Sequence, residues 1–218
     1  MTRQIISYPK SGRTWIRYIL HLLELSELIQ FHHDGFEFND GSRPPHNFDL
    51  KGRVKHYATI DKIIYIRRDP RDLIVSLYFQ VTGRFQDFFQ FSGTISDFIR
   101  DEYFGAQVLA KFRSMWEQIA ESPRVLTLDY ESCHQDINAT MNRLLHHFEL
   151  DVPVEKIRQA TDAASFANMK KLEDENAFPY PWLRRRNDAP KVRKGEVKSY
   201  LQSLTPVDIE YLDKIFGL

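Results

Sequence analysis

The chain has 218 residues, with 30 basic and 30 acidic side chains and a formal net charge of zero. This length fits one domain with a single large core, and the balanced charge argues against a generic polyanion-binding protein such as a nucleic-acid-binding domain. Cys133 is the one cysteine, which excludes an internal disulfide and a thiolate zinc cluster.

No secretory or membrane segment is predicted. The first residues lead directly into a short apolar strand pattern, without the apolar stretch of a signal peptide. The longest apolar stretch, residues 15–29, is interrupted by Arg17 and Glu24 among others, so it is not expected to span a bilayer. The sequence therefore predicts a cytoplasmic protein with no membrane span, a location that also suits a free thiol.

The first predicted elements form half of a βαβ unit. Residues 5–8 are β-branched and aromatic, which predicts a strand, and residues 9–12 supply a turn. Residues 14–29 carry apolar side chains at helical spacing, which predicts an amphipathic helix. A strand, a Gly-containing turn and a helix in this order are the usual opening of a parallel α/β sheet.

The rest of the chain continues this alternation. Residues 31–52 are rich in His, Asp, Asn, Gly and Pro, which predicts an exposed loop. Further strands are predicted at residues 62–66 and 124–128, helices at residues 73–77, 137–147, 154–164 and 205–216, and a basic, irregular segment at residues 179–194. The sequence thus predicts one domain, residues 1–218, with a three-layer α/β/α fold, a central mainly parallel sheet and a P-loop nucleotide-binding-like topology.

The most informative segment is residues 8–15, Tyr-Pro-Lys-Ser-Gly-Arg-Thr-Trp. A strand that turns through Gly12 into a helix presents unpaired backbone N–H groups and the positive end of the helix dipole to an anion. Lys10 adds a positive charge, while Ser11 and Thr14 add hydroxyl donors. The order differs from the nucleoside-triphosphatase loop G-x-x-x-x-G-K-[ST], because here the Lys precedes the Gly. The pattern predicts a phosphate-binding loop, with a generic turn and a chance Lys as the alternative.

Residues 9–15 resemble the 5′-phosphosulfate loop of the cytosolic-type sulfotransferases, P-K-S-G-T-T-W, and depart from it only at Arg13. Members of that family transfer a sulfuryl group from 3′-phosphoadenosine 5′-phosphosulfate (PAPS) to a hydroxyl or amine, and release 3′,5′-adenosine bisphosphate (PAP). The resemblance implies that Lys10 also stabilises the leaving phosphate and that Trp15 stacks on adenine. The donor-binding residues that it implies in this loop are Lys10, Ser11, Gly12, Arg13, Thr14 and Trp15.

Two later stretches resemble the family's 3′-phosphate site. Residues 65–76 are similar to its strand-to-helix motif, and place Arg68 and Ser76 at the contacting positions. An Arg can grip a phosphate through two parallel donors, which suits this role. Residues 192–197 resemble the family's R-K-G-x-x-G element, which closes over the 3′-phosphate side. Its residues here are Arg193, Lys194 and Gly195, with Lys198 where the second Gly usually lies.

Two stretches resemble the family's adenine-binding segments. Residues 165–171 are similar to S-F-x-x-M-K-K, which implies that Ser165 and Phe166 border the adenine; Ala164 replaces the usual preceding Thr. Tyr130 opens a strand-end Tyr-Glu pair whose Tyr approaches the base in the family. The matching segments lie in the family's order from residue 8 to 195. The chain is therefore identified as a short, bacterial-like member of the family, with PAPS as donor and no metal requirement.

The predicted general base is His56. The family has a His at the end of a K-T-H-type strand, and residues 54–56, Val-Lys-His, are similar to that strand end. An imidazole is suited to proton transfer at neutral pH. The alternatives are His32, His33, His46 or an acidic residue. No histidine spacing in the sequence indicates a metal centre.

An aromatic cluster is the predicted acceptor site. Residues 85–91 contain four Phe, and in the family this region borders the acceptor pocket. We expect Phe85, Phe88 and Phe89 to wall an apolar site for a small hydroxyl-bearing molecule. Core packing or an oligomer contact is the alternative, and the sequence leaves both the acceptor's identity and the oligomeric state open.

Three other functions compete with sulfuryl transfer. A P-loop small-molecule kinase shares the loop after the first strand, although the Lys-before-Gly order disfavours it. A PAPS- or PAP-binding protein without transfer activity is compatible with the departures at Val54 and Ala164. An RNA-binding module would use the basic residues of 184–194, but no aromatic stacking motif accompanies them. The leading prediction is that these basic residues converge on one doubly anionic nucleotide, together with Lys10, Arg13, Arg67 and Arg68.

Overall fold

Four parallel strands form one sheet in residues 1–180, 183–192 and 195–218, which this computed structural model describes. The strand order is β2-β1-β3-β4. Their bounds are β1 (Arg3–Ser7), β2 (Gln30–His32), β3 (Lys62–Arg67) and β4 (Val125–Asp129). The register aligns Ile5 of β1 with Ile64 of β3, and Ile64 with Leu126 of β4, so the carboxyl ends of the strands meet at one edge.

The chain divides into two compact units, each described here by itself. Unit 1 comprises residues 1–36, 46–68 and 112–165, and unit 2 comprises residues 37–45, 69–111 and 166–218. The sheet belongs to unit 1. Because the chain enters unit 2 and returns, helix α6 (Ala106–Ile119) begins in unit 2 and ends in unit 1.

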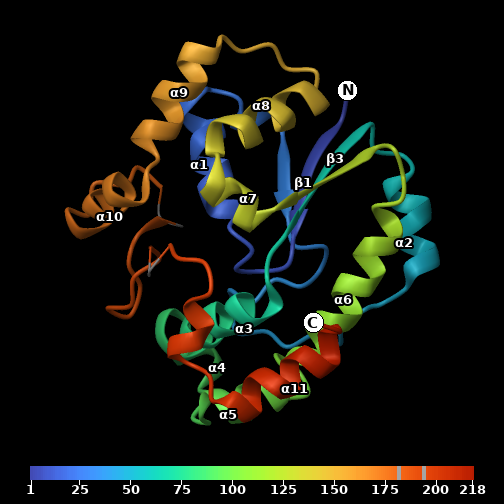
Figure 1. Cartoon of the computed structure of the whole chain (residues 1–218), viewed down its shortest axis with the longest axis vertical. Helices are drawn as coiled ribbons and strands as arrows, with labels where there is room; N and C mark the ends of the chain where they lie inside the picture. Colours follow the sequence, from blue (N-terminus) through green and yellow to red (C-terminus); the bar gives the residue numbers. More distant parts are fainter. Residues whose placement is uncertain (181–182, 193–194) are drawn as a thin grey trace. The chain divides into compact units, whose positions relative to one another are not determined.

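Helices cover both faces of the sheet in unit 1 (Figure 1). The helical elements here are α1 (Arg13–Leu22), η1 (Ser26–Leu28), α2 (Leu50–Tyr57), α7 (Tyr130–Gln135), α8 (Ile137–His147) and α9 (Val154–Ala163). The central strands β1 and β3 are almost fully buried, which explains their continuous apolar sequence. On one face, Trp116 of α6 stacks on Tyr65 of β3, with ring centroids 5.2 Å apart. The predicted α/β fold with a parallel central sheet is confirmed.

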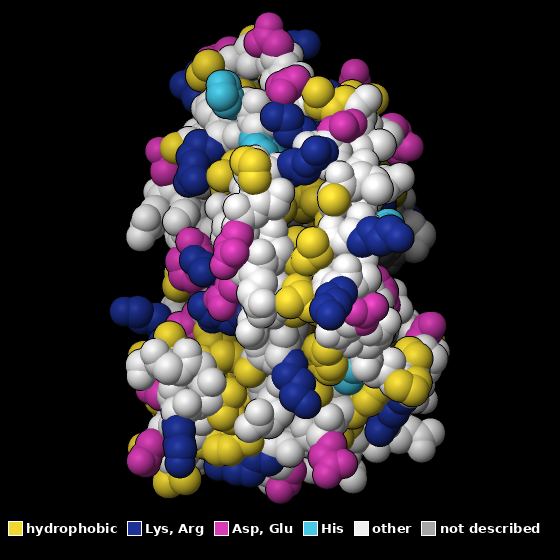
Figure 2. All heavy atoms as spheres, turned by 90° about the vertical axis from the view of Figure 1, so that its right-hand side faces the viewer, with side chains coloured by type: hydrophobic (Ala, Val, Ile, Leu, Met, Phe, Trp, Pro, Cys, Tyr) yellow, Lys and Arg dark blue, Asp and Glu magenta, His cyan; other side chains and the backbone are white. Residues whose placement is uncertain are grey.

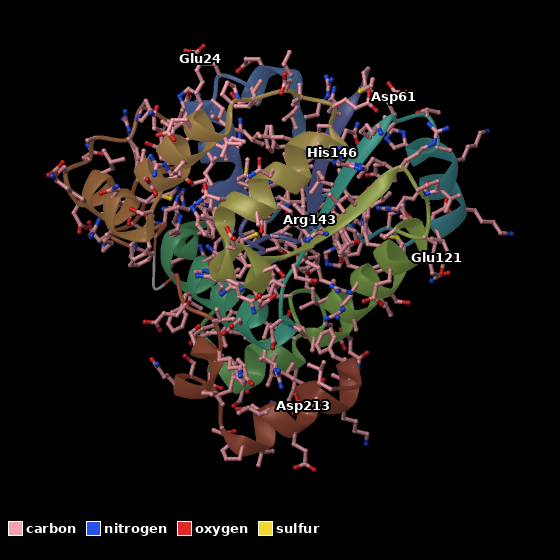
Figure 3. All side chains as sticks on the ribbon, turned by 45° about the horizontal axis from the view of Figure 1, so that its top comes forward. Glu24, Asp61, Glu121, Arg143, His146 and Asp213 are labelled. Atoms are coloured by element: carbon pink, nitrogen blue, oxygen red, sulfur yellow. The ribbon has the colours of Figure 1, made fainter. Side chains whose placement is uncertain are left out.

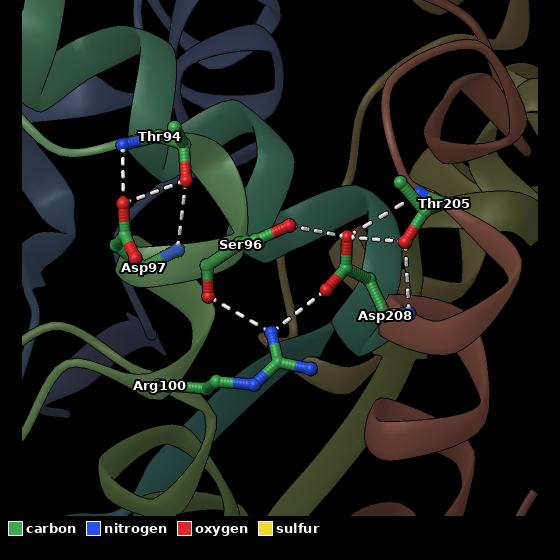
Figure 4. A network of polar contacts seen from close by, with 6 residues as sticks. All are labelled: Thr94, Ser96, Asp97, Arg100, Thr205 and Asp208. Carbon is green, nitrogen blue, oxygen red and sulfur yellow. Dashed lines mark hydrogen bonds and ion pairs between the residues drawn. The ribbon is translucent and has the colours of Figure 1, made fainter.

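Unit 2 is helical in the part of it that the structure describes. Its elements are α3 (Pro70–Phe79), η2 (Gln80–Arg84), α4 (Gln86–Phe89), α5 (Ile95–Arg100), α10 (Phe166–Asp174), η4 (Ser199–Gln202) and α11 (Pro206–Phe216). Asp208 of α11 accepts hydrogen bonds from Ser96 and Arg100 of α5, at 2.6 and 2.7 Å (Figure 4). Thr94 and Thr205 cap these two helices, each in a reciprocal capping box. The network ties α11 to α5.

Three predictions of local structure are wrong. The helix expected over residues 14–29 ends at Leu22, because Glu24 adopts a left-handed conformation and turns the chain into strand β2. The exposed loop expected over residues 31–52 contains buried Phe36 and Phe38, which pack as core residues. The strand end expected at residues 54–56 is part of helix α2.

Basic and acidic side chains are mixed on the surface, as the formal net charge of zero predicts. On the face drawn in Figure 2, Lys and Arg side chains are interspersed with Asp and Glu side chains. Among the described residues, no helix combines the length and the apolar content that a membrane crossing requires. In the same residues, no group of three or more His, Cys, Asp or Glu side chains is arranged to hold a metal ion.

Candidate functional site

The phosphate-binding loop predicted at residues 8–15 joins the carboxyl end of β1 to the amino terminus of α1. Lys10 and Gly12 both have positive φ, 73° and 93°, and these two left-handed residues fold the chain sharply between strand and helix. No side chain caps α1, and its first turn contains no acidic residue. The amino terminus of α1 thus presents the positive end of the helix dipole, which favours an anion, with no acidic side chain in the first turn to oppose one.

Gly12 is required by the packing of the loop as well as by its backbone. A Cβ at this position would overlap the ring of Tyr130, the first residue of α7. Arg68, which follows β3, donates to the carbonyl oxygen of Lys10 at 3.0 Å, and its guanidinium lies 4.3 Å from the centroid of the Tyr130 ring. Four predicted donor residues, Lys10, Gly12, Arg68 and Tyr130, therefore meet at the carboxyl edge of the sheet.

Trp15 connects this loop to the predicted adenine segment. Its indole N–H donates to the carbonyl oxygen of Ala164 at 2.8 Å, immediately before Ser165. Its ring lies in edge contact with Tyr130, with centroids 6.4 Å apart. Ser11 is buried in the loop, and Thr14 is half-buried on the first turn of α1. Unit 1 thus brings together all the predicted donor residues that it contains.

His33 is the histidine that the structure places beside the phosphate loop. It follows β2, which pairs with β1 next to the loop. Nδ1 lies 2.7 Å from the carbonyl oxygen of Ser7, so this nitrogen carries the hydrogen and donates. Nε2 then accepts from the guanidinium of Arg13, also at 2.7 Å. These two contacts fix the orientation of the His33 ring, and Nε2 lies on the side of the phosphate loop.

Asp34 anchors the turn that carries His33. Its carboxylate accepts hydrogen bonds from Arg53 Nε at 2.6 Å, from the Tyr57 hydroxyl at 2.7 Å and from Trp116 Nε1 at 3.0 Å. These donors come from α2 and α6, so two helices hold the turn in place. The sequence offers His33 only as an alternative base, because the strand β2 that brings it to the loop is not predicted from the sequence.

His56 lies elsewhere in unit 1. It is exposed on α2, and its ring contacts the ring of Tyr57, with centroids 4.8 Å apart. The chain then runs to Asp61, whose backbone N–H and carboxylate bond to Thr2 at the amino end of β1. Figure 3 labels Asp61 at this edge. The predicted strand end that would have aimed His56 at the phosphate loop does not exist, because residues 50–57 form helix α2.

Unit 2 contains the rest of the predicted donor residues. Ser76 is buried on α3, and Phe166 begins α10. Gly195 has a φ of 63°, and a Cβ there would overlap the ring of Phe166. The structure therefore brings Phe166 and Gly195 into contact. The predictions for Arg193 and Lys194 lie outside the described residues.

The aromatic cluster of unit 2 divides into surface and core. Phe85 and Phe88 stack with centroids 5.8 Å apart, and Phe88 is 40% exposed. The Arg186 guanidinium covers Phe88 at 3.9 Å from the ring centroid. Phe89 is instead a core residue in edge contact with Phe104. Of the three predicted acceptor residues, Phe85 and Phe88 thus form a partly exposed pair that Arg186 contacts, whereas Phe89 belongs to the core.

Several basic residues predicted to converge on the nucleotide have internal partners. Arg186 forms two hydrogen bonds of 2.7 Å with the Asp87 carboxylate, and Arg185 pairs with Asp174. Arg67 is bonded to Asp129 at 2.7 Å, and this hydrogen bond raises the pKa of the guanidinium. Arg67, Arg185 and Arg186 are therefore engaged in ion pairs within the protein.

Two further features of unit 1, a surface hollow and the thiol of Cys133, are not assigned to this site. A hollow of about 440 Å³ lies between β4 and α8, lined by Leu126, Asn142, Arg143, His146 and His147, of which Figure 3 labels Arg143 and His146. It is open to solvent and lies toward the amino end of the sheet, since His147 bonds to the Ile63 carbonyl there. Burial raises the pKa of the Cys133 thiol to about 11, which keeps it protonated and unreactive at neutral pH.

Comparison with known proteins gives a consistent result. A family profile described as "Sulfotransferase domain" matches residues 45–217. The rabbit (Oryctolagus cuniculus) amine sulfotransferase is 23% identical over 97% of this chain and 78% of its own length. Human sulfotransferase 1E1 is 25% identical over 96% of this chain and 80% of its own length.

Solved structures share the fold. A mouse sulfotransferase in complex with PAP superimposes with a TM-score of 0.71 and 18% identity, over 99% of this chain and 82% of that one. Retinol dehydratase, in complex with androsterone and PAP, superimposes with a TM-score of 0.69 and 14% identity, over 99% of this chain and 79% of that one.

Proposed function

This chain belongs to the sulfotransferase domain family of enzymes, and we propose that it transfers the sulfuryl group of PAPS to a hydroxyl or amine acceptor and releases PAP. The observation that carries the proposal is the loop between β1 and α1. There, the amino terminus of α1 has no side-chain cap and no acidic residue in its first turn, and the adjacent Arg68 donates to the carbonyl oxygen of Lys10. PAP is also the nucleotide named in the complexes of the structural relatives.

The donor residues that the sequence predicts are assigned here unit by unit, and we propose that residues 1–218 act as one sulfotransferase domain. In unit 1, the assigned residues are Lys10, Ser11, Gly12, Arg13, Thr14, Trp15, Arg68, Tyr130 and Ser165. In unit 2, they are Ser76, Phe166, Arg193, Lys194 and Gly195. The loop suits a 5′-phosphosulfate, because backbone N–H groups and a helix dipole bind a dispersed negative charge without a metal ion.

The rate enhancement would come mainly from Lys10 and from positioning. The donor supplies an activated sulfuryl group whose bond to the bridging phosphate oxygen breaks as the acceptor oxygen or nitrogen bonds to sulfur. Negative charge grows on that bridging oxygen, so a cation at Lys10 stabilises the transition state more than the ground state. The loop also fixes the direction of in-line attack, which lowers the entropic barrier.

We propose His33, rather than His56, as the general base that takes the acceptor's proton. Ser7 holds the hydrogen on Nδ1, so that Nε2 is the basic nitrogen and lies on the side of the phosphate loop. Arg13 contacts the same Nε2, which means that its guanidinium must move toward the anionic donor before the base can act. The role predicted for His56 is untested, and its exposed position on α2 gives it less support.

The acceptor would be a small molecule with an apolar body. Phe85 and Phe88 offer a stacked, partly exposed aromatic surface, with Phe89 behind them. One relative is named for an amine acceptor, and a structural relative is in complex with the steroid androsterone, so amines and steroids are the classes to try first. A cytoplasmic location stays a prediction from the sequence.

The proposal is tested by incubating the protein with PAPS and single acceptors — a primary amine, a steroid alcohol and a phenol — and measuring PAP release in the presence of EDTA. We expect release with at least one acceptor class, and a loss of about 100-fold or more in Lys10→Ala. Consumption of ATP with Mg²⁺, without any PAPS turnover, would indicate a kinase. Tight PAP binding without transfer to any acceptor would indicate a binding protein.

A further inference from the structure

Two buried carboxylates hold the backbone on either side of Gly195. Asp72 of α3 bonds to residues 198–200, and Glu173 of α10 bonds to residues 191–192. All of these residues belong to unit 2. We call residues 191–192 and 195–200 the anchored segment.

Asp72 acts as a cap for η4, the short helix that follows Gly195. It is 0% exposed, and its carboxylate accepts from Lys198 N at 2.6 Å, Tyr200 N at 2.9 Å and Ser199 Oγ at 3.0 Å. Lys198 has a φ of 61° and provides no side-chain cap of its own. The carboxylate from α3 therefore satisfies backbone donors that η4 would otherwise leave unpaired.

Glu173 performs the same task before Gly195. Its side chain is fully buried, and its carboxylate accepts from the backbone N–H of Lys191 and, at 3.2 Å, from that of Val192. Lys170, one turn earlier on α10, lies 3.8 Å from the same carboxylate. Hydrogen bonds to an ionised acceptor are about twice as strong as neutral ones, so residues 191–192 and 198–200 are firmly held.

The helices that hold the segment are those that carry predicted donor residues. Asp72 and Ser76 are four residues apart on α3, and therefore share one face of that helix. Glu173 shares α10 with Phe166, whose ring packs directly on Gly195. Any shift of the anchored segment would move Gly195 relative to both Ser76 and Phe166.

We propose that Asp72 and Glu173 are positioning residues of the donor site, which set the affinity for the 3′-phosphate side of the nucleotide by holding the anchored segment before the ligand arrives. The inference rests on the proposed function. Its physical basis is that a segment ordered in advance loses less conformational entropy on binding. A buried carboxylate is a strong anchor for this purpose, because breaking its hydrogen bonds would leave a desolvated charge unpaired.

The test compares Asp72→Asn and Glu173→Gln with Asp208→Asn. Asp208 is an equally buried carboxylate of unit 2 with a similar number of hydrogen bonds, but it ties α5 to α11 and does not touch the anchored segment (Figure 4). It therefore controls for a general loss of stability. The measurements are PAP and AMP affinities by calorimetry, the thermal midpoint, and amide hydrogen exchange at Lys191, Val192, Lys198 and Tyr200.

We expect Asp72→Asn and Glu173→Gln to weaken PAP binding by about 10-fold or more, because ordering the segment then opposes binding. AMP binding and kcat at saturating donor should change by less than about threefold, since neither depends on the 3′-phosphate contacts. In these two variants the four amides should exchange faster than in wild type. Asp208→Asn should lose a similar amount of stability, but its PAP affinity should stay within about twofold of wild type. Ser199→Ala, which removes one hydrogen bond without altering the charge, should give an intermediate loss if Asp72→Asn does not fold.

The possible failures are distinguishable. A wild-type protein that does not bind PAP would overturn the proposed function and this inference with it. A wild-type protein that binds PAP, together with variants that bind it equally well, would overturn the inference alone. An equal loss of PAP affinity in Asp208→Asn would also overturn it, because the effect would then follow stability rather than position.

Discussion

The phosphate loop of unit 1 and the anchored segment of unit 2 are built in different ways. The loop is continuous with a buried strand and a helix, so its neighbours along the chain give it its shape, and Gly12 allows the turn. The anchored segment is irregular apart from one short helix, and two carboxylates from distant parts of the chain hold it. A local backbone motif thus shapes the loop of unit 1, whereas a set of long-range hydrogen bonds shapes the anchored segment of unit 2.

This difference predicts where each region is vulnerable. The loop should fail when its own residues change shape, since its supports, β1 and α1, are core elements. The anchored segment should be sensitive to residues far away in sequence, because Asp72 lies 126 positions from Lys198. The following variants examine the contrast, from the largest expected effect to the smallest.

The largest effect is expected at the base beside the loop. His33→Ala should lower kcat by about 100-fold or more, because general-base catalysis typically contributes 10²–10⁴-fold. PAP affinity should stay within about threefold, since His33 is not assigned to the nucleotide. His56→Ala is the matched control and should keep turnover within about twofold, as expected for an exposed side chain. A larger loss in His56→Ala than in His33→Ala, measured as initial rates of PAP release, would contradict this account of unit 1.

The second variant changes the shape of the loop itself. Gly12→Ala should weaken PAP binding by about 30-fold or more, because a methyl group would collide with Tyr130 as well as strain a left-handed residue. Gly35→Ala has a similar φ of 81° but meets no atom within 4 Å, so it isolates the backbone strain. It should lose about 1 kcal/mol of unfolding free energy, with PAP affinity nearly unchanged. Calorimetric titration of both variants with PAP measures the difference. Equal PAP affinities in Gly12→Ala and Gly35→Ala would mean that the contact with Tyr130 does not shape the site.

The third variant makes the same change in the anchored segment. Gly195→Ala should weaken PAP binding by only about 5- to 10-fold, because Phe166 is 41% exposed and can move away from the new methyl group. Gly217→Ala, at a φ of 67° in open space, is its control and should not affect PAP affinity. If Gly195→Ala weakened PAP binding as much as Gly12→Ala does, Phe166 would be no more able to move than Tyr130, which would contradict the difference drawn between the two segments.

The smallest effect on PAP binding is expected outside both regions, where Asp208 contributes to stability rather than to the ligand site. Burial opposes ionisation of Asp208, but hydrogen bonds from Ser96, Arg100 and Thr205 outweigh it and lower its pKa to about 2. Since the folded pKa lies below the ordinary value of 3.8, this stabilisation is complete above about pH 4 and is lost as the pH falls through 2. Urea unfolding should show a loss of about 2 kcal/mol over that range, reduced in Asp208→Asn. An unchanged pH dependence in the variant would assign the effect to other carboxyl groups.

The sequence predicts the elements that local pattern determines. Strands β1, β3 and β4, and helices α8 and α11, lie within one or two residues of their predicted positions, because each has a clear apolar period. The residues of the phosphate loop were also predicted, since a strand, a Gly turn and a helix determine the anion site without distant partners.

What the sequence does not predict depends on pairing between distant segments. β2 has three residues and no periodicity of its own, and becomes a strand only by pairing with β1. Because β2 is not predicted, the sequence does not bring His33 to the phosphate loop. The motif match at residues 54–56 therefore favours His56 as the base. Asp72 and Glu173 likewise resemble ordinary surface acids in sequence, because their backbone partners are 18 or more positions away.

The central claim is that the chain binds a nucleotide with charges at both the 5′ and 3′ positions. Isothermal titration of the wild-type protein with PAP, AMP and ATP tests it without knowledge of the acceptor. We predict that PAP binds at least about tenfold more tightly than AMP, since a hydrogen-bonded 3′-phosphate should contribute about 1.5–3 kcal/mol, and more tightly than ATP with Mg²⁺. Equal affinities for PAP and AMP, or a preference for ATP, would contradict the account.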